Sequence, residues 1–122
     1  MVLADTSVWV SHLRIGGPHL KTLLDEAGVL CHPFVVGELA CGNLKPRREI
    51  LSLLQTLPSA PVVSQEEALH FIERQSLAGS GIGFVDAHLL ASAQLIGVPL
   101  WTADLLLKRA AEKLRLSYAP SR

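Results

Sequence analysis

Residues 2–7 read Val2-Leu3-Ala4-Asp5-Thr6-Ser7, an apolar run followed at once by an acid and two hydroxyls, near the start of a 122-residue chain. Residues 98–101 form a second apolar run, which is followed by Thr102 and then by Asp104. Short buried runs separated by segments with helical spacing predict a parallel β-sheet covered by helices on both faces. Ligands gather at the carboxyl edge of such a sheet, and Asp5 and Asp104 should both lie there.

The expected elements alternate along the whole chain, separated by glycine, proline and serine. Strands are expected at residues 2–4, 29–31 and 98–101, with further short strands at 62–63 and 116–118. Helices are expected at residues 6–13, 19–27, 33–41, 47–57, 65–78, 84–96 and 103–114. This pattern predicts the α/β class, in one domain that spans residues 1–122.

Two further acids interrupt apolar helical segments. Asp86 shares a helix stripe with Leu90, and Glu38 shares one with Phe34 and Cys41. Each of these helices is therefore expected to direct one carboxylate inward. Burying a carboxylate is costly unless its charge is compensated, and a divalent metal ion shared by several acids is the simplest compensation.

The chemistry of such a cluster favours magnesium or manganese, because its donors are all hard oxygens. Several carboxylates around these ions suit the hydrolysis of phosphodiester bonds. The hydroxyls of Thr6, Ser7 and Thr102 lie close to the acids in the sequence, and we expect them to orient carboxylates or waters.

Each acid also has a purely structural interpretation. Asp5 and Asp104 fit the N-cap position of a helix, and Asp86 fits the first turn, where the helix dipole favours an acid. Glu38 has no capping role, and an arginine would have to neutralise it. The structural interpretation is weaker for four acids together than for any one of them.

Four segments, in the right order across nearly the whole chain, resemble the PIN-domain ribonucleases. They are residues 3–9 (Leu-Ala-Asp-Thr-Ser-Val-Trp), 36–39 (Val-Gly-Glu-Leu), 81–89 (Gly-Ile-Gly-Phe-Val-Asp-Ala-His-Leu) and 101–104 (Trp-Thr-Ala-Asp). The short length and the wording of residues 81–89 resemble the VapC toxins of bacterial toxin–antitoxin pairs. One such motif alone is weak, whereas four in series are specific.

The resemblance implies a PIN-like three-layer α/β/α sandwich with a short-stranded parallel sheet. It also implies an endoribonuclease that requires Mg²⁺ or Mn²⁺, acts on RNA, forms a homodimer and is inhibited by a cognate antitoxin protein. Its catalytic and metal-binding acids would be Asp5, Glu38, Asp86 and Asp104. The fourth acid is the position that varies most in the family.

Charge gives little sign of a nucleic-acid-binding protein, since 11 basic residues balance 11 acidic ones. Any hold on phosphate must therefore be local. Basic residues do gather in two places, and the candidates for contact with RNA are Arg47, Arg48, Lys108 and Arg109. Solvated helix faces would give the same pattern.

Composition predicts a folded cytoplasmic protein with no membrane segment. No apolar run approaches the roughly 18 residues of a membrane span, and no secretion signal is visible. The two cysteines, Cys31 and Cys41, are expected to be buried and unpaired. The larger aromatic residues are expected in the core rather than as surfaces for base stacking: Trp9, Phe34, Phe84 and Trp101.

Two other functions stay open. A phosphatase with Asp5 as nucleophile needs a second aspartate two residues on, where this chain has Ser7, so that motif fits poorly. The stronger alternative is a catalytically silent metal-binding or protein-interaction module of the same fold.

Overall fold

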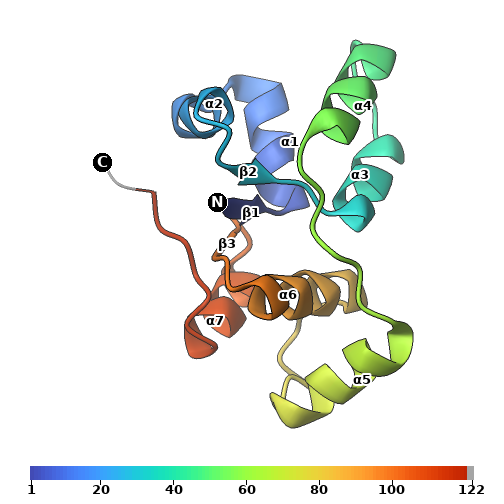
Figure 1. Cartoon of the computed structure of the whole chain (residues 1–122), viewed down its shortest axis with the longest axis vertical. Coiled ribbons are helices and arrows are strands. Elements are labelled where there is room, and N and C mark those ends of the chain that lie inside the picture. The colour runs from blue at the N-terminus through green and yellow to red at the C-terminus, as the bar shows by residue number, and fades with distance from the viewer. Residues whose placement is uncertain (121–122) are drawn as a thin grey trace.

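A parallel sheet runs through the middle of the computed structural model, which describes residues 1–120 (Figure 1). Its strands are β1 (Val2–Ala4), β2 (Val29–Leu30) and β3 (Leu100–Trp101), in the order β2-β1-β3. Leu3 is paired with Leu30 on one side and with Leu100 on the other. The first strand is thus central, and the residue that follows it, Asp5, lies at the middle of the carboxyl edge.

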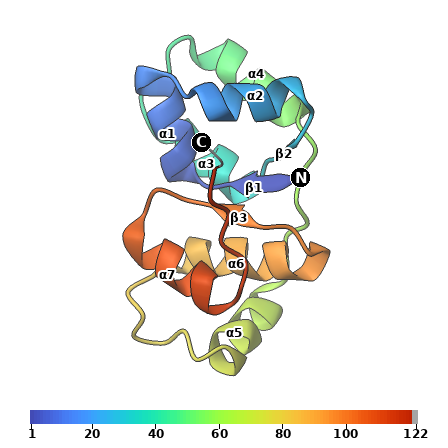
Figure 2. The ribbon, with the colours of Figure 1, turned by 90° about the vertical axis from the view of Figure 1, so that its left-hand side faces the viewer.

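Helices cover both faces of this sheet, as expected. They are α1 (Thr6–Ile15), α2 (Pro18–Asp25), α3 (Pro33–Ala40), α4 (Arg47–Thr56), α5 (Gln65–Arg74), α6 (Phe84–Ile96) and α7 (Leu105–Lys113). Both views place α1 to α4 on one side of the sheet and α5 to α7 on the other (Figure 2). The predicted three-layer α/β/α sandwich is therefore confirmed.

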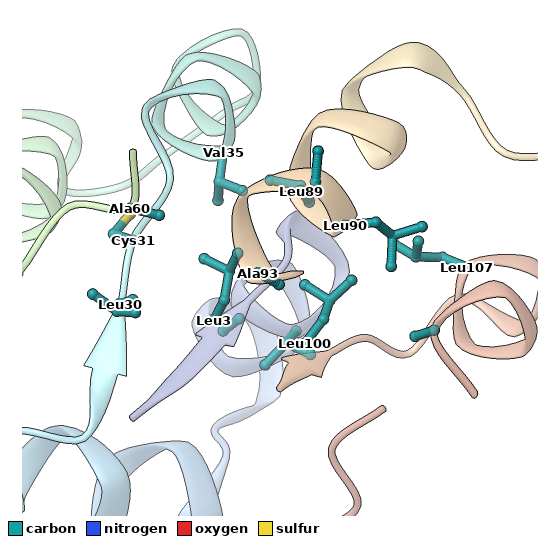
Figure 3. Packing of buried hydrophobic residues seen from close by; sticks show 14 of the residues in the cluster. Leu3, Leu30, Cys31, Val35, Ala60, Leu89, Leu90, Ala93, Leu100 and Leu107 are labelled. Carbon is teal, nitrogen blue, oxygen red and sulfur yellow. The ribbon is translucent and has the colours of Figure 1, made fainter. Parts of the chain in front are cut away.

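The core fills the space between the sheet and the two helical layers (Figure 3). Leu3 and Leu100 from the strands and Leu90 and Ala93 from α6 are all fully buried. Burying one leucine side chain contributes roughly 2 kcal/mol, so this contact holds α6 firmly against the sheet. The stripe of α6 that includes Leu90 faces inward, as predicted.

Several expected boundaries shift where the backbone takes a left-handed conformation. The helix expected to reach residue 27 ends at Asp25, because Ala27 has a φ of 55°. Similarly, α5 stops at Arg74, short of residue 78, because Ser76 also has a φ of 55°. L-residues rarely adopt this conformation, and a helix cannot continue through it.

The two extra strands are replaced by single-residue bridges. The strand expected at residues 62–63 is absent, and Ser59 pairs with Cys31 beside β2 instead. At the other edge, Ser117 pairs with Leu100 beside β3, where a strand was expected at residues 116–118. The sheet therefore gains one short pairing at each edge.

Two expectations about burial are wrong in part. Cys31 is buried and Cys41 is exposed, although both are free as expected. Trp9 lies in the core, 1% exposed, whereas Phe84 is 45% exposed. No helix within residues 1–120 combines the length and the apolar character needed to span a membrane.

His32 is a fully buried polar residue that fixes the start of α3. Its Nδ1 atom accepts a hydrogen bond from the backbone N–H of Phe34 at 3.0 Å, so the ring proton must be on Nε2. Nε2 lies 3.2 Å from the hydroxyl of Ser92, which donates to the carbonyl of Pro61 at 2.6 Å. Burial, assisted by the charge of His88, lowers the pKa of His32 to about 4.

This histidine should make the fold sensitive to acid. The unfolded chain binds a proton at His32 near the ordinary pKa of 6.5, whereas the folded protein does so only near 4. The contribution of His32 to stability should therefore be complete above about pH 6.5 and fall by about 3 kcal/mol as the pH drops to about 4. Urea unfolding between pH 7 and pH 4 measures this loss.

The matched variant is His32→Asn, which keeps an oxygen acceptor for Phe34 at the helix start. It should be less stable at pH 7 but should lose much less stability on acidification. His70→Asn, at an exposed position on α5, should behave like the wild type. Equal acid sensitivity in the wild type and in His32→Asn would contradict the assignment.

Candidate active site

Asp5 is the buried centre of the carboxyl edge, with 4% of its side chain exposed. Its carboxylate accepts hydrogen bonds from the Ser7 hydroxyl at 2.6 Å, from the Val8 N–H at 3.1 Å and from the Thr102 hydroxyl. Burial raises the pKa of Asp5, and these three donors partly oppose the rise. The residue is thus both the N-cap of α1 and a carboxylate held in a defined orientation.

The hydroxyls of Ser7 and Thr102 form a bridge between α1 and the segment that connects β3 to α7. They lie 3.3 Å from each other, and each donates to Asp5. Ser7 also accepts from the N–H of Ala103 at 2.9 Å, and Thr102 accepts from the N–H of Asp104 at 3.0 Å. This network fixes the position of Asp104 relative to Asp5. Thr6 has a separate role, because it donates to Glu38 at 2.6 Å.

Asp86 is half-buried at the start of α6, where its carboxylate accepts from the N–H of Gly83 at 3.2 Å. Burial raises the pKa of Asp86, and the bond from Gly83 opposes that rise. The negative charges of Asp104, Asp5 and Glu38 raise it further. All four predicted acids therefore share one electrostatic environment at the carboxyl edge.

Glu38 does not lie on an inward face, contrary to the expectation. It is exposed, as is Cys41 on the same stripe, and the buried face of α3 consists of Val35 and Leu39. Asp104 is also exposed and caps α7 by accepting from the N–H of Leu107 at 3.0 Å. Two of the four acids are therefore open to solvent.

The four acids are neighbours but do not surround a common point. Within residues 1–120, no three side chains of His, Cys, Asp or Glu stand close enough together to bind one ion. The reason lies in the capping bonds, which turn Asp86 towards Gly83 and Asp104 towards Leu107. Glu38 and Asp104 are exposed, and the oxygen donors of the four acids are of the kind that a hard divalent cation prefers.

The basic residues predicted to contact RNA lie in two different settings. Arg47 donates to the carbonyls of Ala40 at 2.6 Å and Gly42 at 3.3 Å, so it caps the end of α3. Arg48 is exposed beside it on α4. Lys108 and Arg109 are exposed on α7, just beyond Asp104.

An apolar groove next to Glu38 is the main feature near the site that the motifs did not locate. It has a volume of about 390 Å³ between α1, α3 and α4. Val10 and Leu13 of α1 line it and are 38% and 37% exposed. The spacing of Val10 and Leu13 could have predicted an apolar stripe on α1. It could not have predicted that neighbouring helices leave this stripe partly uncovered.

Comparisons with known proteins agree with this fold. The family profile of the PIN domain matches residues 2–113. Ribonuclease VapC32 of Mycobacterium tuberculosis is 47% identical over 122 residues, in strain CDC 1551 / Oshkosh and in strain ATCC 25618 / H37Rv alike. The match covers 98% of this chain and 97% of the mycobacterial protein.

Two solved structures share the fold at low sequence identity. FitAcB from Neisseria gonorrhoeae is 20% identical with a TM-score of 0.64, over 92% of this chain and 94% of that one. PAE2754 from Pyrobaculum aerophilum is 15% identical with a TM-score of 0.65, over 94% and 93% of the two chains.

A parallel α/β/α sandwich with an acidic carboxyl edge is the architecture of a PIN domain, and the chain belongs to the PIN domain family. Within that family it is a protein of the VapC type, like the two mycobacterial ribonucleases.

The shared charge at this edge should make the fold more stable when Asp86 is neutralised. Asp86→Asn keeps an oxygen that accepts from Gly83 but removes one of the repelling charges. In chelator at neutral pH the variant should be more stable by about 1 kcal/mol or less, because the site is half open to solvent. The difference should shrink in acid, where the wild-type carboxyl becomes neutral too.

Thermal melts with and without Mg²⁺ check this expectation. Mg²⁺ should raise the melting temperature of the wild type, because a ligand of the folded state stabilises it, and should raise that of Asp86→Asn less. Asp25→Asn, at an exposed position on α2, should respond to Mg²⁺ like the wild type. An Asp86→Asn variant that is less stable in chelator and keeps the full Mg²⁺ response would contradict the shared-metal interpretation.

Proposed function

We propose that this protein is an endoribonuclease of the VapC type that requires Mg²⁺ or Mn²⁺. The observation that carries the proposal is the position of Asp5 and Asp104 just after β1 and β3, at the carboxyl edge of a parallel sheet, with Asp86 in the first turn of α6. These acids offer the oxygen ligands that Mg²⁺ and Mn²⁺ prefer. Membership of the PIN domain family supports the same activity, as does the name of the mycobacterial relatives.

We assign a proposed role to each residue at this edge. The proposed metal ligands and catalytic residues are Asp5, Glu38, Asp86 and Asp104. Ser7 and Thr102 hold the carboxylate of Asp5, and Thr6 holds that of Glu38. A metal ion held by these acids would supply a water of lowered pKa and positive charge to offset that of the phosphodiester.

The partner in this proposal is a cognate antitoxin that covers the acidic edge. Glu38 lines the same groove as Val10 and Leu13, so a segment seated in it would contact one of the four acids. An arginine or lysine from that segment would neutralise the acidic cluster much as a metal ion does. The proposal also includes one domain over residues 1–122, a homodimer and action in the cytoplasm.

The competing function is a catalytically silent module of the same fold. It would keep the acids as metal ligands or as a docking surface and would cut no RNA. All four acids are present in the chain, which favours catalysis.

RNA cleavage with defined metals tests the proposal directly. The purified protein should cleave total RNA with Mg²⁺ or Mn²⁺ and should lose that activity in chelator. The cleavage activity of Asp86→Asn should be at least about 100-fold lower than that of the wild type. Replacing a residue that only supports a metal ligand typically lowers activity by up to about this factor. Asp25→Asn is the active control. Full cleavage in chelator, or activity restored by Zn²⁺ alone, would overturn the metal requirement, and no cleavage under any condition would favour the silent module.

The two arginines of α4 should separate RNA binding from folding. Arg48→Ala should weaken RNA binding and reduce the slope of log affinity against log salt by about 1, since one phosphate contact is lost. Arg47→Ala should instead lower the free energy of unfolding by about 1 kcal/mol, because its bonds to Ala40 and Gly42 are lost. Filter binding across a salt series and urea unfolding measure the two effects. An unchanged salt slope for Arg48→Ala would remove it from the RNA surface.

The antitoxin arrangement predicts where inhibition is lost. Leu13→Asp should weaken inhibition by the proposed cognate antitoxin while cleavage persists, because a charge at this apolar position of the groove disfavours its occupant. Leu53→Asp, at an exposed apolar position of α4 that is not among the groove-lining residues, is the matched control. Cleavage assays with increasing antitoxin measure inhibition. A complex whose partner stays away from Asp5 and Asp86 would contradict the arrangement.

A further inference from the structure

Phe84 is an exposed aromatic side chain at the rim of the acidic edge. It is the first residue of α6, two positions before Asp86, and 45% of it is exposed. The sequence favoured a place in the core for this ring. Its exposure two positions from Asp86 makes this ring a candidate contact for a ligand at the acidic edge.

The ring of Phe84 is held from below by other rings. His88, which is 3% exposed, packs edge-to-face against Phe84, with 4.7 Å between the ring centroids and 86° between the ring planes. His88 also packs against Phe34 of α3, with 4.8 Å between the ring centroids and 66° between the planes. Phe34 in turn packs against His32, with 5.0 Å between the centroids. Since His32 is anchored to Ser92, the chain of rings gives Phe84 a rigid support between the helices that carry Glu38 and Asp86.

Phe84 also borders an apolar cleft of about 180 Å³. The cleft lies between α5 and the start of α6, and its other lining residues are Ile72, Leu77, Ala78, Gly79, Ile82, Gly83 and Ala87. No charged side chain lines it. A flat apolar group could lie against Phe84 here without desolvating a charge.

Two exposed leucines continue this apolar rim on α7. Leu105 is 60% exposed and Leu106 is 44% exposed, directly after Asp104. Leu106 touches the loop that leads to Phe84, because a Cβ added at Gly81 would lie only 2.9 Å from its Cδ1. Gly81 has a φ of 89°, which a side chain would strain as well. Leu106, two residues after Asp104, thus packs against the loop that precedes Phe84.

Electrostatics alone gives this surface a weak hold on RNA. The chain has no net charge, and the acids at the edge repel phosphate in the absence of metal. Of the basic candidates, Arg47 and Arg48 lie on α4, and Lys108 and Arg109 follow Asp104 on α7. Stacking of a base on an aromatic ring does not depend on the protein's charge, so it can contribute RNA affinity that electrostatic attraction does not supply here.

We propose that Phe84 is a stacking platform for one nucleobase of the RNA strand whose backbone crosses the acidic edge. This inference rests on the proposed ribonuclease function and adds a site for the base beside that for the phosphate. Because a ring stacks on any base, the platform orients a single strand without choosing its sequence.

Binding measured over a salt series tests the platform. The probe is a fluorescein-labelled single-stranded RNA of random sequence, about 12 nucleotides long. All proteins carry Asp86→Asn so that the RNA is not cut. Phe84→Ala and Phe84→Leu should raise Kd about tenfold, and Phe84→Tyr should leave it unchanged. The salt slope should be the same for all of them, unlike that of Arg48→Ala.

The controls separate stacking from other roles of this ring. Leu95→Ala, at a 64% exposed position on the same helix, should bind RNA normally. The fluorescence of 2-aminopurine in a labelled RNA should be quenched on binding to the parent protein and to Phe84→Tyr, but not on binding to Phe84→Leu. If Phe84→Ala unfolds, the Phe84→Leu result decides.

Three outcomes would overturn the platform. Normal RNA binding by Phe84→Leu would show that only apolar character matters. A changed salt slope would point to a lost phosphate contact. Loss of RNA binding together with dissociation of a dimer in sedimentation would assign Phe84 to a contact between two copies of the chain. Cleavage by the otherwise wild-type protein reports separately on the proposed function, so a failure of the platform leaves that result standing.

Discussion

A buried negative charge at the end of the central strand is the constraint on which the rest of the structure depends. The carboxylate of Asp5 is removed from water and is stabilised by Ser7, Val8 and Thr102. These donors come from α1 and from the segment after β3, so the same bonds that make the charge tolerable also join two layers of the fold. Leaving this carboxylate without its donors would cost stability and would also displace the segment that carries Asp104.

The acids of the edge combine a structural and an electrostatic role. Asp5 and Asp104 cap α1 and α7, and Asp86 accepts from the N–H of Gly83 at the start of α6. The positive ends of three helix dipoles therefore meet at one edge and partly offset the repulsion among the acids. Capping and clustering, which compete as explanations of the sequence, are compatible in the structure. This explains how the fold tolerates a dense cluster of charge before any cation binds.

The strands and the helices of the sandwich were predictable because long apolar periodicities leave few alternatives. What failed were the details that depend on neighbours. Both stripes of α3 look apolar in the sequence, and only packing decides that Val35 is buried while Glu38 faces solvent. The prediction that Phe84 is buried failed for a related reason, because a side chain in the first turn of a helix can point either into the core or towards solvent. The left-handed conformation of Ser76, which ends α5 early, has no signal in the residue type.

The single-residue bridges at Ser59 and Ser117 affect how the protein behaves at high concentration. A long unpaired edge strand offers a row of free N–H and C=O groups that can recruit another chain into an intermolecular sheet. Here each edge is occupied by a short irregular segment, and Cys31 and Leu100 already exchange their backbone bonds with it. The protein should therefore have little tendency to aggregate through the edges of its sheet, even at high concentration.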